Sequence, residues 1–273
     1  MKKHIKNIFF CAIIIFLIPK FTISSKAQDF SFDKAYQDYQ HNLTQYQKAF
    51  SEYDYAKNAY IMNSTLNLKD DVRLKMLDLL TTRDELIRVY LTMLRMRIVE
   101  NNGLTNDEKN SIFLKIDKEI EFYNNDKTKY STNDSLTTLF SRNEELENRY
   151  KFETHKIIKE VIAYVSLGEE ISLRLNHEQI YTNLRLLIDS RFSSNELVRT
   201  QFGHWFNDID ATIQIITQNE KEVRQEIDKI ELNSQSKDVT CEPCNEILSY
   251  SIVSLSQYNG FLTEMINFIK NQP

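Results

Sequence analysis

Two cysteines near the C-terminus form the motif in this chain that is best suited to chemistry. Cys241 and Cys244 enclose Glu242 and Pro243, and they directly precede a segment with helical periodicity. A helix N-terminus stabilises thiolates, and a Cys-x-x-Cys pair can alternate between dithiol and disulfide. The motif is therefore a candidate redox site. Other interpretations stay open, namely a small structural disulfide, half of a metal site shared between chains, and free thiols.

The surroundings of this motif favour the structural disulfide. Thioredoxin-like proteins place Cys-x-x-Cys after a strand and set a cis-proline opposite it. Here no segment shows the alternation typical of strands, and beyond residue 27 the prolines are Pro243, inside the motif, and the terminal Pro273. We expect a structural disulfide and keep a thiol–disulfide redox protein as the alternative.

Histidines are the next residues that could do chemistry. A di-iron helical bundle needs two Glu-x-x-His motifs, and none of His41, His155, His177 and His204 follows a glutamate by three positions. Asp38 stands three residues before His41, but a single pair with the shorter carboxylate is better explained as a solvated contact. We therefore expect no metal site within one chain and no cofactor.

Paired acids could serve as general acid and base. Glu144-Glu145 and Glu169-Glu170 lie within helical patterns, and we interpret both pairs as solvated helix faces. No P-loop, dinucleotide-binding glycine motif, nucleophile elbow or calcium loop occurs. The sequence thus predicts no catalytic constellation and leaves open whether the protein is an enzyme. It favours a scaffold or binding module that acts through its surface.

An aromatic stripe defines the first long helix of the predicted bundle. Its large members recur every seven residues at Phe32, Tyr39, Tyr46, Tyr53 and Tyr60. Small residues follow three positions behind at Ala35, Ala49 and Ala56. This pattern predicts a long helix over about 30–62 packed along a second helix, with Tyr39, Tyr46 and Phe50 largely buried. The alternative is that the stripe stacks sugars or binds a partner.

The remaining chain also reads as long helices joined by short connections. Expected ranges are about 69–99, 105–123, 135–190, 196–232 and 245–270. Gly103 is predicted as a left-handed cap and Thr105 with Glu108 as a capping box, while Gly168 either continues or interrupts its helix. Only 4 glycines and 3 prolines occur, which favours helices over sheets. The predicted fold is all-α, an elongated antiparallel bundle of long, coiled-coil-like helices.

Residues 1–27 read as a secretory signal peptide, with a basic start, an apolar core at 8–19, and Ser25 and Ala27 before a cut at Gln28. Cleavage would remove five lysines and no acid, moving the formal net charge from −5 to −10. An exported acidic chain argues against nucleic acid or an anionic membrane as partner. An uncleaved segment would instead make a membrane-tethered coiled coil.

Two stretches carry a resemblance to known proteins. FDKAYQDYQ and LTTRDELIRVYLTMLRMRI, within about 28–125, resemble a group of exported all-helical proteins of uncultivated small-genome bacteria, which has no assigned activity. The resemblance implies export and a helical fold. We divide the chain into 28–125, a helical hairpin plus third helix, and 126–273, a long-helix bundle, packed as one elongated domain. The expected partner is a protein or cell-envelope component at the cell surface, in the periplasm or outside the cell, and oligomers are compatible with the pattern.

Overall fold

Long helices make up almost all of the structure. The computed structural model describes residues 31–192, 196–232 and 240–271, so the predicted signal peptide lies outside the described residues. The elements are α1 (Phe32–Met62), α2 (Leu66–Glu100), α3 (Asn106–Lys127), α4 (Leu136–Arg149), the π-helical turn η3 (Tyr150–Thr154), α5 (His155–Arg191), α6 (Glu196–Leu232) and α7 (Glu242–Lys270). No strand occurs among these residues, which confirms the all-α prediction.

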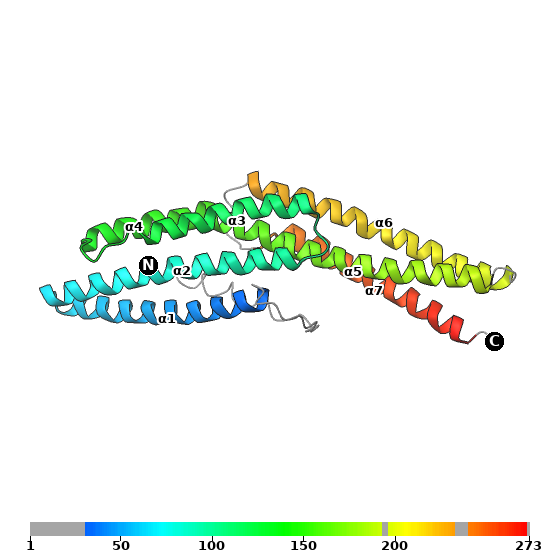
Figure 1. Cartoon of the computed structure of the whole chain (residues 1–273), viewed down its shortest axis with the longest axis horizontal. Coiled ribbons are helices and arrows are strands. Elements are labelled where there is room, and N and C mark those ends of the chain that lie inside the picture. Colours follow the sequence, from blue (N-terminus) through cyan, green and yellow to red (C-terminus); the bar gives the residue numbers. More distant parts are fainter. Residues whose placement is uncertain (1–30, 193–195, 233–239, 272–273) are drawn as a thin grey trace.

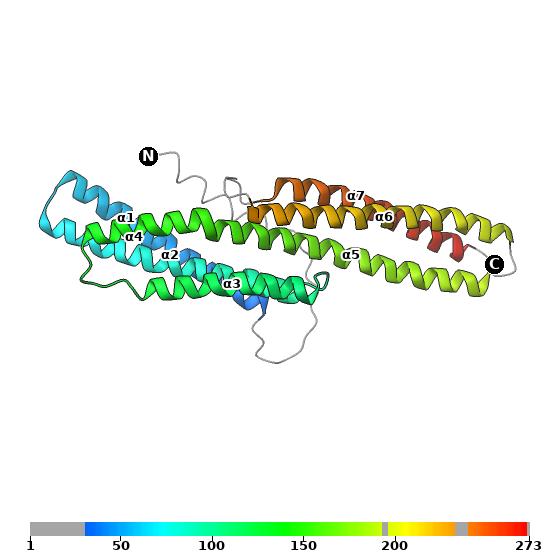
Figure 2. The same ribbon diagram turned by 90° about the horizontal axis from the view of Figure 1, so that it is seen from above.

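The helices form an elongated rod, and a different group of helices packs together at each of its two ends (Figure 1). At one end, α2 packs against α1, α3 and α4; at the other, α5, α6 and α7 pack against one another. The α4–η3–α5 helix runs through both groups, as the view from above shows (Figure 2). This helix therefore links the two halves of the molecule.

Alanines let α1 lie close to α2. Ala35, Ala49 and Ala56 are 1–3% exposed, and Tyr53 is buried beside them. Tyr39, Tyr46 and Phe50 pack against the buried clusters with part of their surface in solvent, which agrees with the expectation that they are largely buried. The small residues occupy the centre of the helix contact, so the larger rings are displaced to its edges.

The connection between α2 and α3 differs from the predicted glycine cap. None of the described glycines has a positive φ, so Gly103 is not a left-handed cap. The Asn101 side chain closes the turn instead: its Oδ1 accepts from the backbone N–H of Gly103 at 3.0 Å, and its Nδ2 donates to the Val165 carbonyl at 3.2 Å. A side chain at Gly103 would collide with the backbone of Gly168 on α5, so close approach explains this glycine.

Helix boundaries follow their caps. Thr105 and Glu108 form the predicted capping box, and Ser135 caps α4. The alternative of a break at Gly168 is wrong, because α5 continues through it as far as Arg191. Helix α7 begins at Glu242, three residues earlier than expected, because the Cys241 sulfur caps it.

Candidate functional site

The predicted cysteine pair lies where α5, α6 and α7 meet. Cys241 and Cys244 are joined by a disulfide, and the Cys241 sulfur accepts a hydrogen bond from the Cys244 backbone N–H at 3.2 Å. Cys244 is completely buried, whereas Cys241 is half-buried. Their cluster also contains Ala163, Leu167, Ile171, Val223, Ile227 and Leu248. The disulfide therefore forms part of the apolar packing that fixes the start of α7.

This unequal burial limits the chemistry of the disulfide. Thiol–disulfide exchange needs an incoming thiolate to reach one of the two sulfurs. Only the Cys241 side of the bond has an exposed edge, since Cys244 is enclosed by core side chains. Reduction would place a thiol inside that core, which suits a stabilising crosslink better than a reaction cycle.

The tyrosine stripe packs against α2 at several levels of the bundle. The Tyr39 ring lies 5.3 Å from that of Tyr90, and Tyr46 and Tyr60 flank the cluster that contains Tyr53. Burial raises the pKa of the Tyr46 and Tyr53 hydroxyls. Tyr39, Tyr46 and Tyr60 keep part of their surface in solvent. The stripe is therefore part of the packing between α1 and α2, and the edges of this contact are exposed to solvent.

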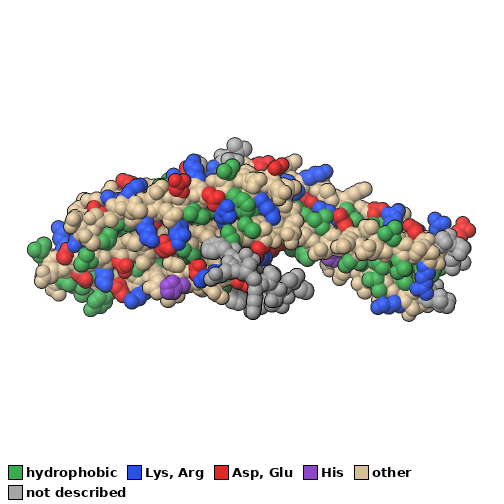
Figure 3. All heavy atoms as spheres, in the orientation of Figure 1, with side chains coloured by type: hydrophobic (Ala, Val, Ile, Leu, Met, Phe, Trp, Pro, Cys, Tyr) green, Lys and Arg blue, Asp and Glu red, His purple; other side chains and the backbone are tan. Residues whose placement is uncertain are grey.

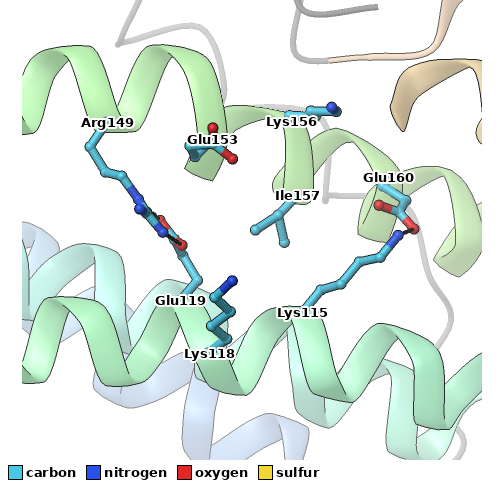
Figure 4. A pocket seen from close by; sticks show the side chains of 8 residues that line it. All are labelled: Lys115, Lys118, Glu119, Arg149, Glu153, Lys156, Ile157 and Glu160. Carbon is cyan, nitrogen blue, oxygen red and sulfur yellow. Dashed lines mark hydrogen bonds and ion pairs between the residues drawn. The ribbon is translucent and has the colours of Figure 1, made fainter. Parts of the chain in front are cut away.

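A polar pocket between α3 and the α4–η3–α5 helix is a feature that sequence reasoning missed (Figure 4). Its lining residues are Lys115, Lys118, Glu119, Arg149, Glu153, Lys156, Ile157 and Glu160. Two ion pairs cross it: Lys115 Nζ to Glu160 Oε1 at 2.7 Å and Arg149 Nη2 to Glu119 Oε2 at 2.6 Å. The Lys118 side chain points into the space between these pairs in Figure 4.

The π-helical turn builds one wall of this pocket. Residues five apart share a face in a π turn, which directs both Arg149 and Thr154 towards Glu119. Glu119 is 1% exposed, and it accepts from the Thr154 hydroxyl at 2.5 Å and from Arg149. The Tyr123 hydroxyl lies 2.8 Å from Thr154 Oγ1 and completes the network. Glu119 is thus held by fixed donors and is not free to act as a base.

The charges of the pocket suit weak binding of a small anion. Arg149 and Lys115 are neutralised by their glutamates, while Lys118 points into the space between the ion pairs and Lys156 also lines the pocket (Figure 4). Such solvated lysines attract anions through charge alone, and salt screens them readily. The pocket shows no pairing of nucleophile and base.

A buried acidic pair corrects one sequence interpretation. Glu170 is 4% exposed and Glu220 on α6 is equally buried, so Glu169-Glu170 is not simply a solvated face. Burial, together with the neighbouring Glu220 carboxylate, raises the pKa of Glu170 to about 8. Arg174 donates to both Glu220 oxygens, at 2.5 and 3.2 Å, leaving Glu170 as the protonated member. Glu169 lies on the other side and pairs with Arg97.

A second buried acid lies in the first half of the rod. Asp84 on α2 is completely buried and accepts from the Tyr130 hydroxyl at 2.6 Å. Burial raises the pKa of Asp84 to about 6. Tyr130 also donates to Asp126 at 3.2 Å, so it fastens the loop after α3 to α2. These contacts stabilise the bundle and do not converge on a pocket.

The histidines are placed individually. His41 and His204 are exposed on α1 and α6, and the His177 ring lies 5.4 Å from that of Tyr258. Within the described ranges, no group of three or more His, Cys, Asp or Glu residues could hold a metal ion. None of the described helices has the length and apolarity needed to cross a membrane.

Comparison with known proteins adds no relative. No protein-family model, curated protein or solved structure matches the chain. The resemblance to exported bacterial helical proteins therefore stays a prediction, and function must be argued from this chain's own surface.

Proposed function

We propose that this protein is an exported helical scaffold that binds a protein or cell-envelope partner through its surface. The observation that carries the proposal is the tip of the α1–α2 hairpin. Ile61, Met62 and Leu66 lie there with 66%, 81% and 80% of their surface exposed. Large apolar side chains grouped in one turn mark interaction sites on soluble proteins.

The shape of the molecule suits this role. The hairpin tip lies at one end of the rod, far from the start of α7 (Figure 1), and hydrophobic side chains are visible at that end (Figure 3). Elsewhere on the face shown, Lys, Arg, Asp and Glu are interspersed and form no large patch of one sign (Figure 3). Binding would therefore depend on apolar contact at the tip and little on net charge.

Site-specific crosslinking in the producing cell tests this proposal. A photoreactive residue at Met62 should give a discrete crosslinked product, and Ile61→Asp together with Leu66→Asp should abolish it. Leu114 on α3, 76% exposed, is the matched control position and should give no such product. The same products from both positions would contradict the proposal. N-terminal sequencing tests export separately, since the mature chain should begin at Gln28.

A thiol–disulfide redox protein is the second candidate. The half-buried Cys241 at the start of α7 favours it, because a single accessible sulfur at a helix N-terminus is the arrangement such proteins need. Complete burial of Cys244 in an apolar cluster argues for a structural crosslink. The third reading, a membrane-tethered coiled coil, depends on residues 8–19, which lie outside the described residues.

A further inference from the structure

The second half of α5 exposes an unusual number of large aliphatic side chains. Between 44% and 65% of the surface is exposed at Leu173, Leu175, Ile180, Leu186 and Leu187. The first half of α5 lies beside α2 and α3. The second half extends past their ends and, among the residues that the structure describes, is accompanied by α6 and α7 (Figure 2). The exposed side chains therefore lie on the part of α5 that α2 and α3 do not cover.

Three of these residues form a regular stripe. Leu173, Ile180 and Leu187 are seven residues apart, so they lie above one another along α5. Asn176 and Asn183, both exposed, stand three places after the first two and fall on the neighbouring row. An asparagine buried at a heptad position can fix the register in which two helices pair, at some cost in stability.

We propose that this stripe is the interface of an antiparallel homodimer with its two-fold axis at Ile180. Because Leu173 and Leu187 lie seven residues before and after Ile180, the axis brings Leu173 against Leu187 of the partner subunit. Each copy then presents the same surface to the other, as a two-fold interface requires.

Charges at the two ends of the stripe select this orientation. Glu169 lies eleven residues before Ile180 and Arg191 eleven residues after it, on the same side of α5. The antiparallel arrangement pairs Glu169 with Arg191 of the partner subunit, twice. A parallel arrangement would place glutamate beside glutamate and arginine beside arginine, which is unfavourable.

Both charged residues are accessible for this contact. Glu169 accepts from Arg97, yet 40% of its side chain stays exposed, so one carboxylate oxygen can take a second donor. Arg191 is exposed, with its guanidinium 5.4 Å from the Phe192 ring centre. A single helix pair is a small interface, so we expect a dissociation constant in the range of about 1–100 μM. Dimerisation is independent of partner binding at the hairpin tip.

Sedimentation velocity over a range of protein concentrations tests the dimer. The protein should pass from monomer to dimer as concentration rises, and Ile180→Glu should raise the dissociation constant at least 30-fold by placing two carboxylates on the axis. Ile215→Glu is the matched control, because Ile215 is 55% exposed and belongs to α6, not to the stripe on α5, and it should leave the constant within twofold. Circular dichroism establishes that both variants are folded. A monomer at all concentrations, or a dimer that Ile180→Glu leaves intact, would overturn the proposal.

Cysteine crosslinking tests the orientation, in a Cys11→Ser background. Under mild oxidation Ile180→Cys should give a covalent dimer, because position 180 meets its own copy on the axis. Leu173→Cys should give none by itself, and Leu173→Cys mixed with Leu187→Cys should give one. Crosslinking of Leu173→Cys to itself would show a parallel pair and refute the antiparallel arrangement.

Discussion

Gly103 and Gly168 meet backbone to backbone where the two halves of the rod join. A Cβ at Gly103 would lie 2.0 Å from the carbonyl oxygen of Gly168, and one at Gly168 would lie 2.1 Å from the Asn101 Oδ1. Because neither position has room for a methyl group, the chain can bring the end of α2 this close to α5 only with glycine at both.

Gly103→Ala should therefore destabilise the protein. The added methyl group would push α2 away from α5 and strain the Asn101 hydrogen bonds, at a cost of about 1–3 kcal/mol or more in the free energy of unfolding. Urea denaturation followed by circular dichroism measures this change.

Gly260→Ala is the control for that experiment. Gly260 lies within α7, and a Cβ there would meet nothing within 4 Å. Alanine is the better helix former, so this change should stabilise the protein by up to about 1 kcal/mol. Equal destabilisation by both substitutions would show that the Gly103–Gly168 contact is not specific.

The glycine contact shows where sequence reasoning about the fold stops. Helical periodicity and caps such as Ser135 and Thr105–Glu108 are local, so helix ranges could be predicted closely. The role of Gly103 could not, because it depends on Gly168, sixty-five residues away in the sequence. The π turn at Tyr150–Thr154 could not be predicted either, because its role is to direct Thr154 towards Glu119 on another helix.

The candidate sites show the same division. The disulfide could be anticipated from Cys241 and Cys244, which are near neighbours in the sequence. The pairing of Glu170 with Glu220 could not, since the partners come from different helices and Glu170 falls in a polar pair. The acidic residue at 170 does interrupt the apolar face of α5 beside Ile171, and this is the one local signal that could have indicated a buried carboxyl group.

The alanines of α1 supply a second stability prediction. Ala56→Leu should destabilise the protein by about 1–3 kcal/mol, because Ala56 is 1% exposed in the contact with α2 and has no space for a larger side chain. The neighbouring Tyr55 is 79% exposed, so Tyr55→Leu should change the free energy of unfolding by no more than about 0.5 kcal/mol. Similar effects at both positions would mean that the alanines do not set the α1–α2 spacing.

Glu170 should make stability depend on pH. Its folded-state pKa of about 8 lies above the ordinary 4.5, so the folded chain holds a proton that the unfolded chain releases. The stabilisation is fully present below about pH 4.5 and is lost as pH rises through about 8. The slope due to this group is at most about 1.4 kcal/mol per pH unit.

Comparison with Glu170→Gln isolates this effect. Asp84 titrates lower, with a pKa of about 6, so the interval from pH 6.5 to 8.5 is the useful one. Stability of the parent protein should fall across this interval relative to that of the glutamine variant. Parallel curves would show that Glu170 is ionised in the folded protein.

Reduction of the disulfide should leave the fold nearly intact. The loop closed by Cys241 and Cys244 is only a few residues long, so its entropic contribution is small. We expect dithiothreitol to leave the helical circular dichroism signal nearly unchanged, with local loosening at the start of α7. Loss of most of the signal would mean that the crosslink, and not helix packing, holds α7.

The reduction potential of the Cys241–Cys244 pair, measured together with the pKa of each thiol, tests most directly whether this protein is a scaffold or a redox protein. Because Cys244 lies in the apolar cluster, we predict a potential below about −300 mV and thiol pKa values that are not lowered. A potential above about −250 mV, with one thiol pKa below about 7, would contradict the scaffold account and establish the redox alternative.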